Sequence, residues 1–552
     1  MNTNLKRDSL NQNERLSSNI LPDLPVSKFD RSFTHKTTFD SGKLVPVMWD
    51  EILPGDSIEL NISSLIRSVV PLAPVMDNAK LTLHAFFVPN RIIWDSWKAF
   101  MGESKTAWDI PNNLTIPRVD YSNLDYESIL KGYNTYFGVN DLSTYLGIPV
   151  YYGDLNSSGQ NKDTLPIAVS ALPFRAYGRI WNDWYRDQNL QDEILIPTND
   201  LDLVAQNLEY GQYDNMDFKE SIRYGLKLAP VSKFADYFTT ALPSPQRGDD
   251  TYLIDSIKKF NLKVDYPSWT ETLESASTFG ITDVGSDGSD ILSVNELRYA
   301  ISIQHFKELD ARGGTRYIEI VKNHFGVDSQ DLRVNRAQFL GGVSQYLQIH
   351  QVNQTTPGNA SGSSQVNQGL GAAGAQSITF LQTQNTITSS FTEHGLLMVM
   401  ISVRPENTYA YGLHKYWTKF TKFDFYFPTF DNIGEQPVYM SEIFYTRENE
   451  IDQVIFGYQP AWADYRYKLN TVSGYFTPKL EQSLYNWTYT TKYDVSKTDK
   501  VVLNADFIEQ KKTNVAQTLT YQNMHQFIAT FYFDYKHSRV MKVDSIPGIN
   551  RI

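Results

Sequence analysis

The chain has 552 residues, of which 41% are hydrophobic and 20% are charged, a balance typical of a folded protein. Its formal net charge of -12 excludes binding of nucleic acid through overall charge, so any such contact requires local basic patches or a separate basic partner. Because there is no cysteine, disulfides, thiolate metal sites and cysteine nucleophiles are also excluded.

The first residues carry no signal for secretion or membrane insertion. Residues 1–16 are polar, and no run in the chain approaches the ~18 apolar residues of a membrane-spanning helix. We therefore expect synthesis in the cytoplasm and no membrane insertion. Residues 1–27 are predicted to form an amino-terminal arm that is ordered only where a neighbour holds it. One folded region is expected over residues 28–552.

Several strands are predicted in the first hundred residues. Over residues 29–60, short β-prone runs are separated by the pairs Ser41-Gly42 and Pro54-Gly55, which mark turns. Apolar residues then alternate with others over residues 80–87, which predicts a strand with one face on a core. Within it, His84 is expected to be half-buried, because no second histidine stands at metal-binding spacing.

The most regular helical pattern covers residues 171–191. Its aromatic side chains recur at spacings of three and four, which is one stripe of an amphipathic helix. The stripe consists of Phe174, Tyr177, Trp181 and Trp184. Pro173 stands where the first turn of a helix tolerates proline. Further along, Ser293 and Glu296 form a capping box that begins a second helix, and another is expected over residues 316–325.

The second half of the chain contains two predicted strands and two predicted loops. A continuous apolar run at residues 396–401 predicts a strand that is buried on both faces, and alternation over residues 525–533 predicts the last clear strand. Residues 351–377 contain no charged and no aromatic residue, which predicts a low-complexity loop. Small polar residues dominate 275–290, so an exposed tip is expected there.

No motif in the chain indicates catalysis or a cofactor. The pattern Gly-x-Gly-x-x-Gly at residues 369–374 lies in a polar loop without a preceding strand, so it does not predict a dinucleotide site. Asp187, Asp424 and Glu435 stand near aromatic residues and are expected to form ion pairs and turn caps. A carboxylate pair for glycoside hydrolysis stays open, because only geometry identifies one. We expect no enzyme activity, no metal and no cofactor.

Several long blocks of this chain resemble the major capsid proteins of gokushoviruses, small single-stranded DNA phages of the microvirus family. The blocks include the LPGD turn at residues 53–56, LPFRAYGRIWNDWYRDQNLQ at residues 172–191 and LDARGGTRYIEIVKNHFGVDSQDLRVNRAQFLGG at residues 309–342. Together the blocks cover roughly three quarters of the chain, and they follow one another in the same order as in the family. They are far more specific than any short motif.

The resemblance implies a mainly β fold, namely a viral jelly roll: an antiparallel β-sandwich with long, partly helical insertions between strands. It also implies a major capsid protein that self-assembles in the host cytoplasm into a T = 1 icosahedral shell around circular single-stranded DNA. The implied partners are further copies of the chain, the DNA genome, a small basic DNA-binding virion protein, other virion proteins and a host surface receptor.

Two groups of residues are candidates for these contacts. The tail over residues 535–552 carries four basic residues against one acid, with Tyr535 and His537 beside them to meet a base. The DNA-contact candidates are Lys536, Arg539, Lys542 and Arg551. An ordinary solvated or subunit-contacting tail is the alternative interpretation.

Residues 251–292 lie between two blocks that resemble the family but do not resemble it themselves. The resemblance implies that an insertion at about this place projects as a protrusion at the threefold axis, and its composition suits an apolar stem with a polar tip. The receptor candidates in it are Tyr266, Trp269, Asp283 and Asp287. A disordered surface loop is the alternative.

Two other protein classes remain open at this point. Aromatic residues make up 13% of the chain, which also suits a carbohydrate-binding or glycoside-cleaving β-sandwich protein. A soluble substrate-binding protein is the second possibility, although the missing signal peptide argues against it.

Overall fold

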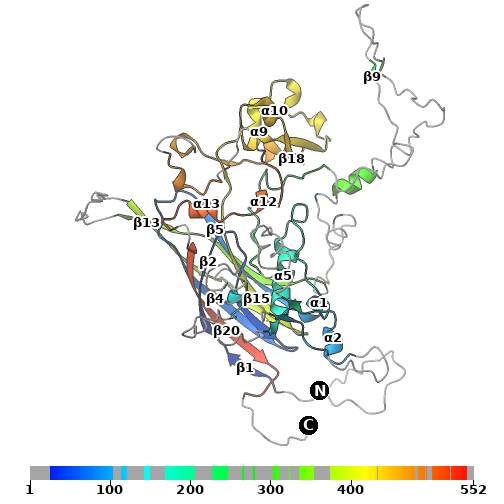
Figure 1. The fold of residues 1–552 in the computed structure, drawn as a ribbon, viewed down its shortest axis with the longest axis vertical. Helices are drawn as coiled ribbons and strands as arrows, with labels where there is room; N and C mark the ends of the chain where they lie inside the picture. Colours follow the sequence, from blue (N-terminus) through cyan, green and yellow to red (C-terminus); the bar gives the residue numbers. More distant parts are fainter. Residues whose placement is uncertain are drawn as a thin grey trace, which may run out of the picture.

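The computed structural model describes residues 25–103, 114–120, 142–148, 168–204, 227–245, 264–265, 278–279, 302–309, 312, 323, 335–353, 373–383, 385–431, 433–478, 483–491, 493, 500–521 and 524–543. These residues are mainly β, and their two large sheets are antiparallel throughout (Figure 1). Among the described residues, every helix is too short or too polar to span a bilayer.

The first large sheet has seven strands, with β20 and β4 at its centre. Its order is β1-β20-β4-β13-β12, while β2 also pairs with β20 and β14 also pairs with β4. The strands are β1 (Ser27–Asp30), β2 (Phe33–Phe39), β4 (Ser57–Ser68), β12 (Ile349–Asn353), β13 (Ala373–Gln382), β14 (Ile387–Ser390) and β20 (Phe527–Arg539).

The second large sheet has four strands in the order β11-β5-β15-β3. They are β3 (Val45–Ile52), β5 (Ala79–Pro89), β11 (Gln338–Tyr346) and β15 (Gly395–Pro405). In β15, every residue from Gly395 to Val403 is buried, so the predicted strand at 396–401 is confirmed with both faces covered.

The two sheets face one another across a single apolar core. Alternate residues of β20 point into it, and Phe527, Phe531 and Phe533 are at most 1% exposed, whereas Ile528 and Tyr532 on the other face are about half exposed. Leu60 of β4 and Val399 of β15 lie in the same core. The alternation predicted for residues 525–533 is therefore confirmed from Phe527, where the strand begins, since a period of two places one face of a strand on a core.

A helix covers the outer face of the second sheet. It consists of α5 (Leu172–Ile180), continued by the π-helical turn η1 (Trp181–Tyr185). The helix predicted for residues 171–191 is therefore confirmed up to Tyr185, and residues 186–191 are not helical. Phe174, Tyr177 and Trp181 are buried, and the Tyr177 hydroxyl donates to the Leu44 carbonyl at 2.7 Å. Trp184, the last residue of the stripe, is 38% exposed.

This helix changes the environment of β5. The prediction that only one face of the strand is buried is wrong, because Phe86 on the opposite face is 1% exposed and packs against Trp184 and Tyr185. His84 is half-buried, as expected, and one of its ring nitrogens, Nδ1, lies 2.8 Å from the Tyr185 hydroxyl. Burial lowers the pKa of His84 to about 4, so it is neutral at physiological pH.

A smaller unit with its own core lies at the end of the molecule opposite β1 (Figure 1). Its core joins Phe238 to residues from 409–508, and its elements include β17 (Glu435–Tyr439), β18 (Ile455–Pro460), α9 (Met440–Ile443), α10 (Asn449–Asp452), α11 (Ala463–Arg466) and α12 (Ala505–Ile508). Three 3-10 turns belong to the same region: η5 (Lys415–Thr418), η6 (Lys422–Asp424) and η7 (Pro428–Phe430).

The remaining elements are short. The helices are α1 (Asn90–Ile93), α2 (Trp97–Phe100), α4 (Leu142–Tyr145) and α13 (Thr513–Ala516), with 3-10 turns η8 (Gly474–Phe476) and η9 (Tyr485–Trp487). The small sheets contain β6 (Arg118–Asp120), β7 (Ala168–Ser170) and β8 (Leu203–Val204), then β9 (Val264–Asp265) and β10 (Thr278–Phe279), then β16 (Thr408–Tyr409) and β19 (Asn470–Thr471).

Two sequence-based boundaries change. The strands β12 and β13 pair from Ile349–Ser377 to Asn353–Ala373, so they extend into the predicted loop at 351–377 from both sides. The last strand continues to Arg539 and is not a tail from residue 535. Residues 302–309 are helical, whereas the predicted capping box and most of the helix at 316–325 lie outside the described residues.

The Ser41-Gly42 turn offers a test of the fold. Gly42 has a φ of 75°, and a Cβ there would lie 2.0 Å from the Gln510 carbonyl oxygen. Gly42→Ala should therefore cost at least about 3 kcal/mol of unfolding free energy, from left-handed strain plus displaced backbone.

The matched control is Gly474→Ala, because Gly474 has a φ of 64° with nothing within 4 Å of the new Cβ. It should cost only ~1–2 kcal/mol, the backbone strain alone. Urea unfolding followed by tryptophan fluorescence measures both. Equal losses in the two variants would show that the turn does not pack against Gln510 as described.

Candidate genome-contact and attachment residues

The carboxyl end of β20 enters a buried polar network. Its alternation continues past the apolar residues, so Tyr535 and His537 occupy the same inward face as Phe533 and are at most 1% exposed. The expectation that Tyr535 and His537 are available to stack on a base is therefore wrong for the folded subunit. Both rings lie inside the protein, 5.3 Å apart between centroids.

Two carboxylates hold these side chains. The Tyr535 hydroxyl donates to Asp50 Oδ2 at 2.8 Å, and Arg31 binds both oxygens of Asp50. His537 Nε2 lies 2.8 Å from Asp56 Oδ2, and Asp56 is fully buried. The network thus joins β20 to the segment after β1, to β3 and to the turn before β4.

The turn itself is the LPGD motif of residues 53–56. The Asp56 carboxylate accepts from the Leu53 backbone N–H at 2.8 Å, which closes the turn, and Gly55 has a φ of 89°. Gly55 is needed there because the left-handed region penalises other residues. The motif therefore places one carboxylate both on the turn and against His537.

Burial, followed by the positive charge of Arg539, lowers the pKa of His537, although the hydrogen bond to Asp56 acts in the opposite direction. The groups that face its ring are Arg31, Asp50, Asp56, Tyr535 and Arg539. Burial and the charge of Asp50 raise the pKa of Tyr535, so its hydroxyl remains a donor.

The four DNA-contact candidates occupy different environments. Lys536 points away from the core with 45% of its side chain exposed, and Lys542 is exposed beyond the strand. Arg539 is only 16% exposed and donates to Asp56 Oδ2 at 3.1 Å and to the Glu51 carbonyl. Arg551 lies outside the described residues. Lys536 and Lys542 are therefore accessible to solvent, whereas Arg539 is engaged within the subunit.

The receptor candidates Tyr266, Trp269, Asp283 and Asp287 lie outside the described residues. Within 251–292 the structure describes only β9 and β10, which pair antiparallel through Thr278–Asp265 and Phe279–Val264. This pair is a sheet of its own, with no ladder to the other sheets. Thr278 and Phe279 belong to this ladder, although they fall inside the stretch predicted as an exposed tip.

Three carboxylates take the structural roles expected from the sequence. Asp187 accepts from two backbone N–H groups of the turn that follows it, at 2.8 and 3.0 Å. Asp424 forms a capping box with Thr421, and Glu435 pairs with Arg312 at 2.7 Å. The described residues contain no group of three or more histidine, aspartate or glutamate side chains that could hold a metal ion.

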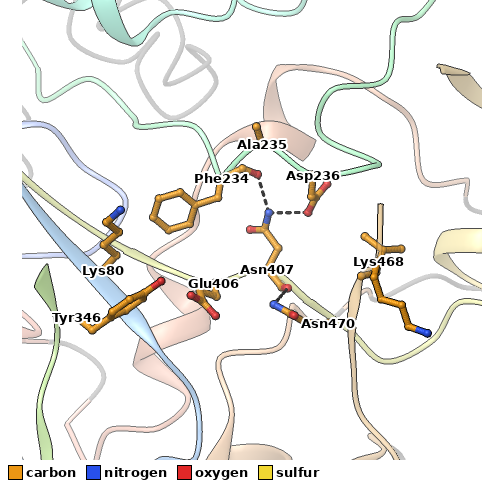
Figure 2. A pocket seen from close by; sticks show the side chains of 10 residues that line it. Lys80, Phe234, Ala235, Asp236, Tyr346, Glu406, Asn407, Lys468 and Asn470 are labelled. Atoms are coloured by element: carbon orange, nitrogen blue, oxygen red, sulfur yellow. Dashed lines mark hydrogen bonds between the residues drawn. The ribbon is translucent and has the colours of Figure 1, made fainter. Parts of the chain in front are cut away.

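Asp236 and Glu406 both line an open pocket of about 360 Å³ (Figure 2). The Asp236 carboxylate accepts from Asn407 at 2.6 Å, from the Tyr409 hydroxyl at 2.7 Å and from two backbone N–H groups. With its lone pairs occupied in this way, Asp236 is a structural acceptor and is not free to exchange protons with a substrate. The pocket therefore does not provide the two free carboxyl groups of a glycosidase.

Comparison with known proteins decides the family. The model of the family described as "Capsid protein (F protein)" matches residues 22–549. The chain belongs to this capsid protein family. It is 32% identical to capsid protein VP1 of Chlamydia phage 1, over 95% of this chain and 96% of the relative. It is 33% identical to capsid protein VP1 of Bdellovibrio phage phiMH2K, over 95% of each chain.

A third relative is capsid protein VP1 of Spiroplasma virus 4, which is 32% identical over 96% of each chain. The resemblance to gokushovirus capsid proteins is thus confirmed over nearly the whole length. The chain is a capsid protein of a bacteriophage, a structural component of the virion and not an enzyme. The carbohydrate-active and substrate-binding alternatives are set aside, because the matched relatives are named as capsid proteins.

We expect the polar network around His537 to make the stability of the subunit depend on pH. A histidine whose pKa is lowered by folding binds fewer protons in the folded state than in the unfolded state. Its contribution to the free energy of unfolding is therefore fully present above the unfolded pKa of about 6.5 and is lost as pH falls. His537→Gln should have a lower free energy of unfolding than the parent at pH 7. Between pH 7 and pH 5, however, its free energy of unfolding should fall by less than that of the parent. The difference between the two slopes cannot exceed about 1.4 kcal/mol per pH unit.

Urea unfolding of unassembled subunits at each pH tests this expectation. The control is His305→Gln, which removes a histidine from an exposed position and should leave the slope of the parent unchanged. Parallel profiles for His537→Gln and the parent would mean that the network does not titrate.

Proposed function

We propose that this chain is the major capsid protein of a T = 1 icosahedral shell that encloses circular single-stranded DNA and is assembled in the host cytoplasm. The observation that carries the proposal is the match over nearly the full length to phage capsid proteins, which leaves no room for an unrelated domain. The strand topology of the subunit supports it independently.

The order of eight strands agrees with a viral jelly roll. Numbered along the chain, β2, β3, β4, β5, β11, β13, β15 and β20 are strands one to eight. The first sheet contains them in the order one-eight-three-six, and the second in the order two-seven-four-five. Every pairing among them is antiparallel, as in two interleaved Greek keys.

The connections between these strands fit the long insertions of the proposed fold. The segment from β5 to β11 contains α5, and the segment from β15 to β20 contains most of the smaller unit with its own core. The first of these segments begins and ends at strands of the second sheet, and the other runs from the second sheet to the first. The sandwich therefore fixes the points at which both segments leave it.

DNA contact is proposed to be local and shared with a second protein. With a net charge of -12, an acidic shell opposes DNA except where cations such as Lys536 and Lys542 are exposed. A small basic virion protein is the partner that would neutralise the remaining phosphates. Other virion proteins and a host receptor complete the proposed set of partners.

Host attachment is proposed for residues 251–292 as a protrusion at the threefold axis. The support is compositional, together with the separate β9–β10 ladder, which is not part of the sandwich. A segment outside the main sheets is free to vary without disturbing the core.

The shell is tested by producing the chain alone and with its phage partners. Light scattering after size-exclusion chromatography and negative-stain microscopy should find closed particles of one size. A stable monomer under all conditions, or open sheets and fibres, would contradict the proposal.

The DNA contact is tested with Lys536→Gln combined with Lys542→Gln. Particles of this double variant should retain less DNA, and the slope of log affinity against log salt should fall by about 1.4 if each lysine meets one phosphate of a single strand. Lys98→Gln with Lys500→Gln removes two exposed lysines elsewhere and is the matched control. Unchanged retention and slope in the first variant would place the DNA contact elsewhere.

The attachment segment is tested by deleting residues 270–290. Shells should still form, since β10, the described element of this segment, does not belong to either large sheet, but binding of particles to host cells should be lost. Failure to assemble would make the segment structural. Normal attachment of the deleted particles would move the receptor site to another surface.

A further inference from the structure

The most aromatic exposed surface of the described residues surrounds the 3-10 turns η5, η6 and η7. We define it as the aromatic surface, made of nine side chains that are each 38% to 87% exposed. They are Tyr416, Trp417, Phe420, Phe423, Phe425, Tyr426, Phe427, Tyr465 and Tyr467. The most exposed is Phe420, at 87%.

Ring contacts and one ammonium group link several of these side chains, since Lys419 lies over both the Phe425 and the Tyr465 ring. Tyr416 lies 5.9 Å from Trp417 and 6.5 Å from Phe425 between ring centroids. Tyr426 lies 6.3 Å from Tyr465, which joins the turns to α11. A patch of neighbouring rings presents one apolar area to a partner, whereas isolated exposed aromatics are ordinary on any protein.

The backbone under the surface is held by its own hydrogen bonds. The His414 ring accepts from the Tyr416 N–H at 3.1 Å, which caps η5. Asp424 accepts from the N–H groups of Phe420 and Thr421 at 3.0 and 2.7 Å, which closes the turn before η6. The rings are thus presented on an ordered backbone although they are 38% to 87% exposed, an arrangement that reduces the entropy lost on binding.

Two anchors fix the turns to the smaller unit. The Lys419 ammonium binds Asp464 at 2.5 Å with both side chains less than 10% exposed, and it lies 4.1 Å from the centre of the Tyr465 ring. Trp462 donates from Nε1 to the Phe430 carbonyl at 3.0 Å. Because the anchors use the polar groups, the outward side of the turns is left to the aromatic rings.

The exposed area is large enough for a protein interface. At ~150–250 Å² for a whole aromatic side chain, the nine exposed fractions amount to roughly 1,000 Å². A stable interface needs about 800 Å² from each partner, and the largest apolar patch of a typical monomer is only ~300–600 Å². The surface is also rich in aromatic side chains, as the cores of protein interfaces are.

We propose that the aromatic surface is a principal contact between subunits, and that its occupant is a second copy of this chain. This inference rests on the proposed function. A shell built from one chain remains soluble only if its subunits bury their largest exposed apolar surface against one another. The pairing is therefore favourable in apolar area.

The first experiment combines Trp417→Ser, Phe420→Ser and Phe423→Ser. All three side chains are at least 63% exposed, so the isolated subunit should melt at the temperature of the parent. The subunit concentration needed for assembly should rise at least about tenfold, because a central aromatic anchor is lost from every contact. Sedimentation across a concentration series measures this threshold.

The matched control combines Phe380→Ser, Tyr521→Ser and Tyr532→Ser, which remove exposed aromatics from other surfaces. It should assemble at nearly the concentration of the parent. Assembly of the first variant at the parent's threshold, or an equal rise in the control, would overturn the assignment. Failure of the parent itself to form shells would instead overturn the proposed function.

The second experiment measures whether the surface is covered in shells and does not require the triple variant to assemble. Because the chain has no cysteine, Phe420→Cys introduces a single thiol that a maleimide dye labels selectively. Labelling should be fast in unassembled subunits and at least about tenfold slower in shells, where a second copy covers the site. Equal labelling rates in the two states would show that the surface faces solvent or another partner, and would overturn the inference.

Discussion

The contact between the inner faces of the two large sheets is the interaction on which the rest of this subunit depends. Phe533 of β20 and Val399 of β15 are fully buried in one core to which strands from both ends of the described chain contribute. Since loop closure becomes only slowly more costly with length, ~0.6 kcal/mol for each doubling, such a frame can carry very long connections. The smaller unit and α5 both lie within such long connections between strands.

The sequence alone predicted the elements whose pattern is local and apolar. The run at 396–401, the alternation at 527–533 and the first three residues of the aromatic stripe, Phe174, Tyr177 and Trp181, are buried as their patterns predict. The second buried face of β5 was missed, because the rings of Trp184 and Tyr185 that cover it lie about a hundred residues away in the chain. A pattern within one strand contains no information about such a cover.

The polar end of β20 shows the same limit. Tyr535, His537 and Arg539 have the composition of a solvated tail, and only Asp50 and Asp56, brought from the other end of the chain, make their burial tolerable. The aromatic surface was missed for the opposite reason. Its residues look like core in any composition analysis, and only the capped turns under Tyr416 and Phe420 reveal that they point outward.

The central place of β20 also has a consequence for synthesis. Its Tyr535 N–H bonds the hydroxyl of Ser32, 503 residues earlier. At a ribosomal rate of ~5–20 residues per second, the early strands therefore wait roughly 25–100 seconds for their partner, with open edges that invite aggregation. The first sheet therefore closes only after nearly the whole chain has been made. An incomplete chain lacks the closed sandwich that a finished subunit presents.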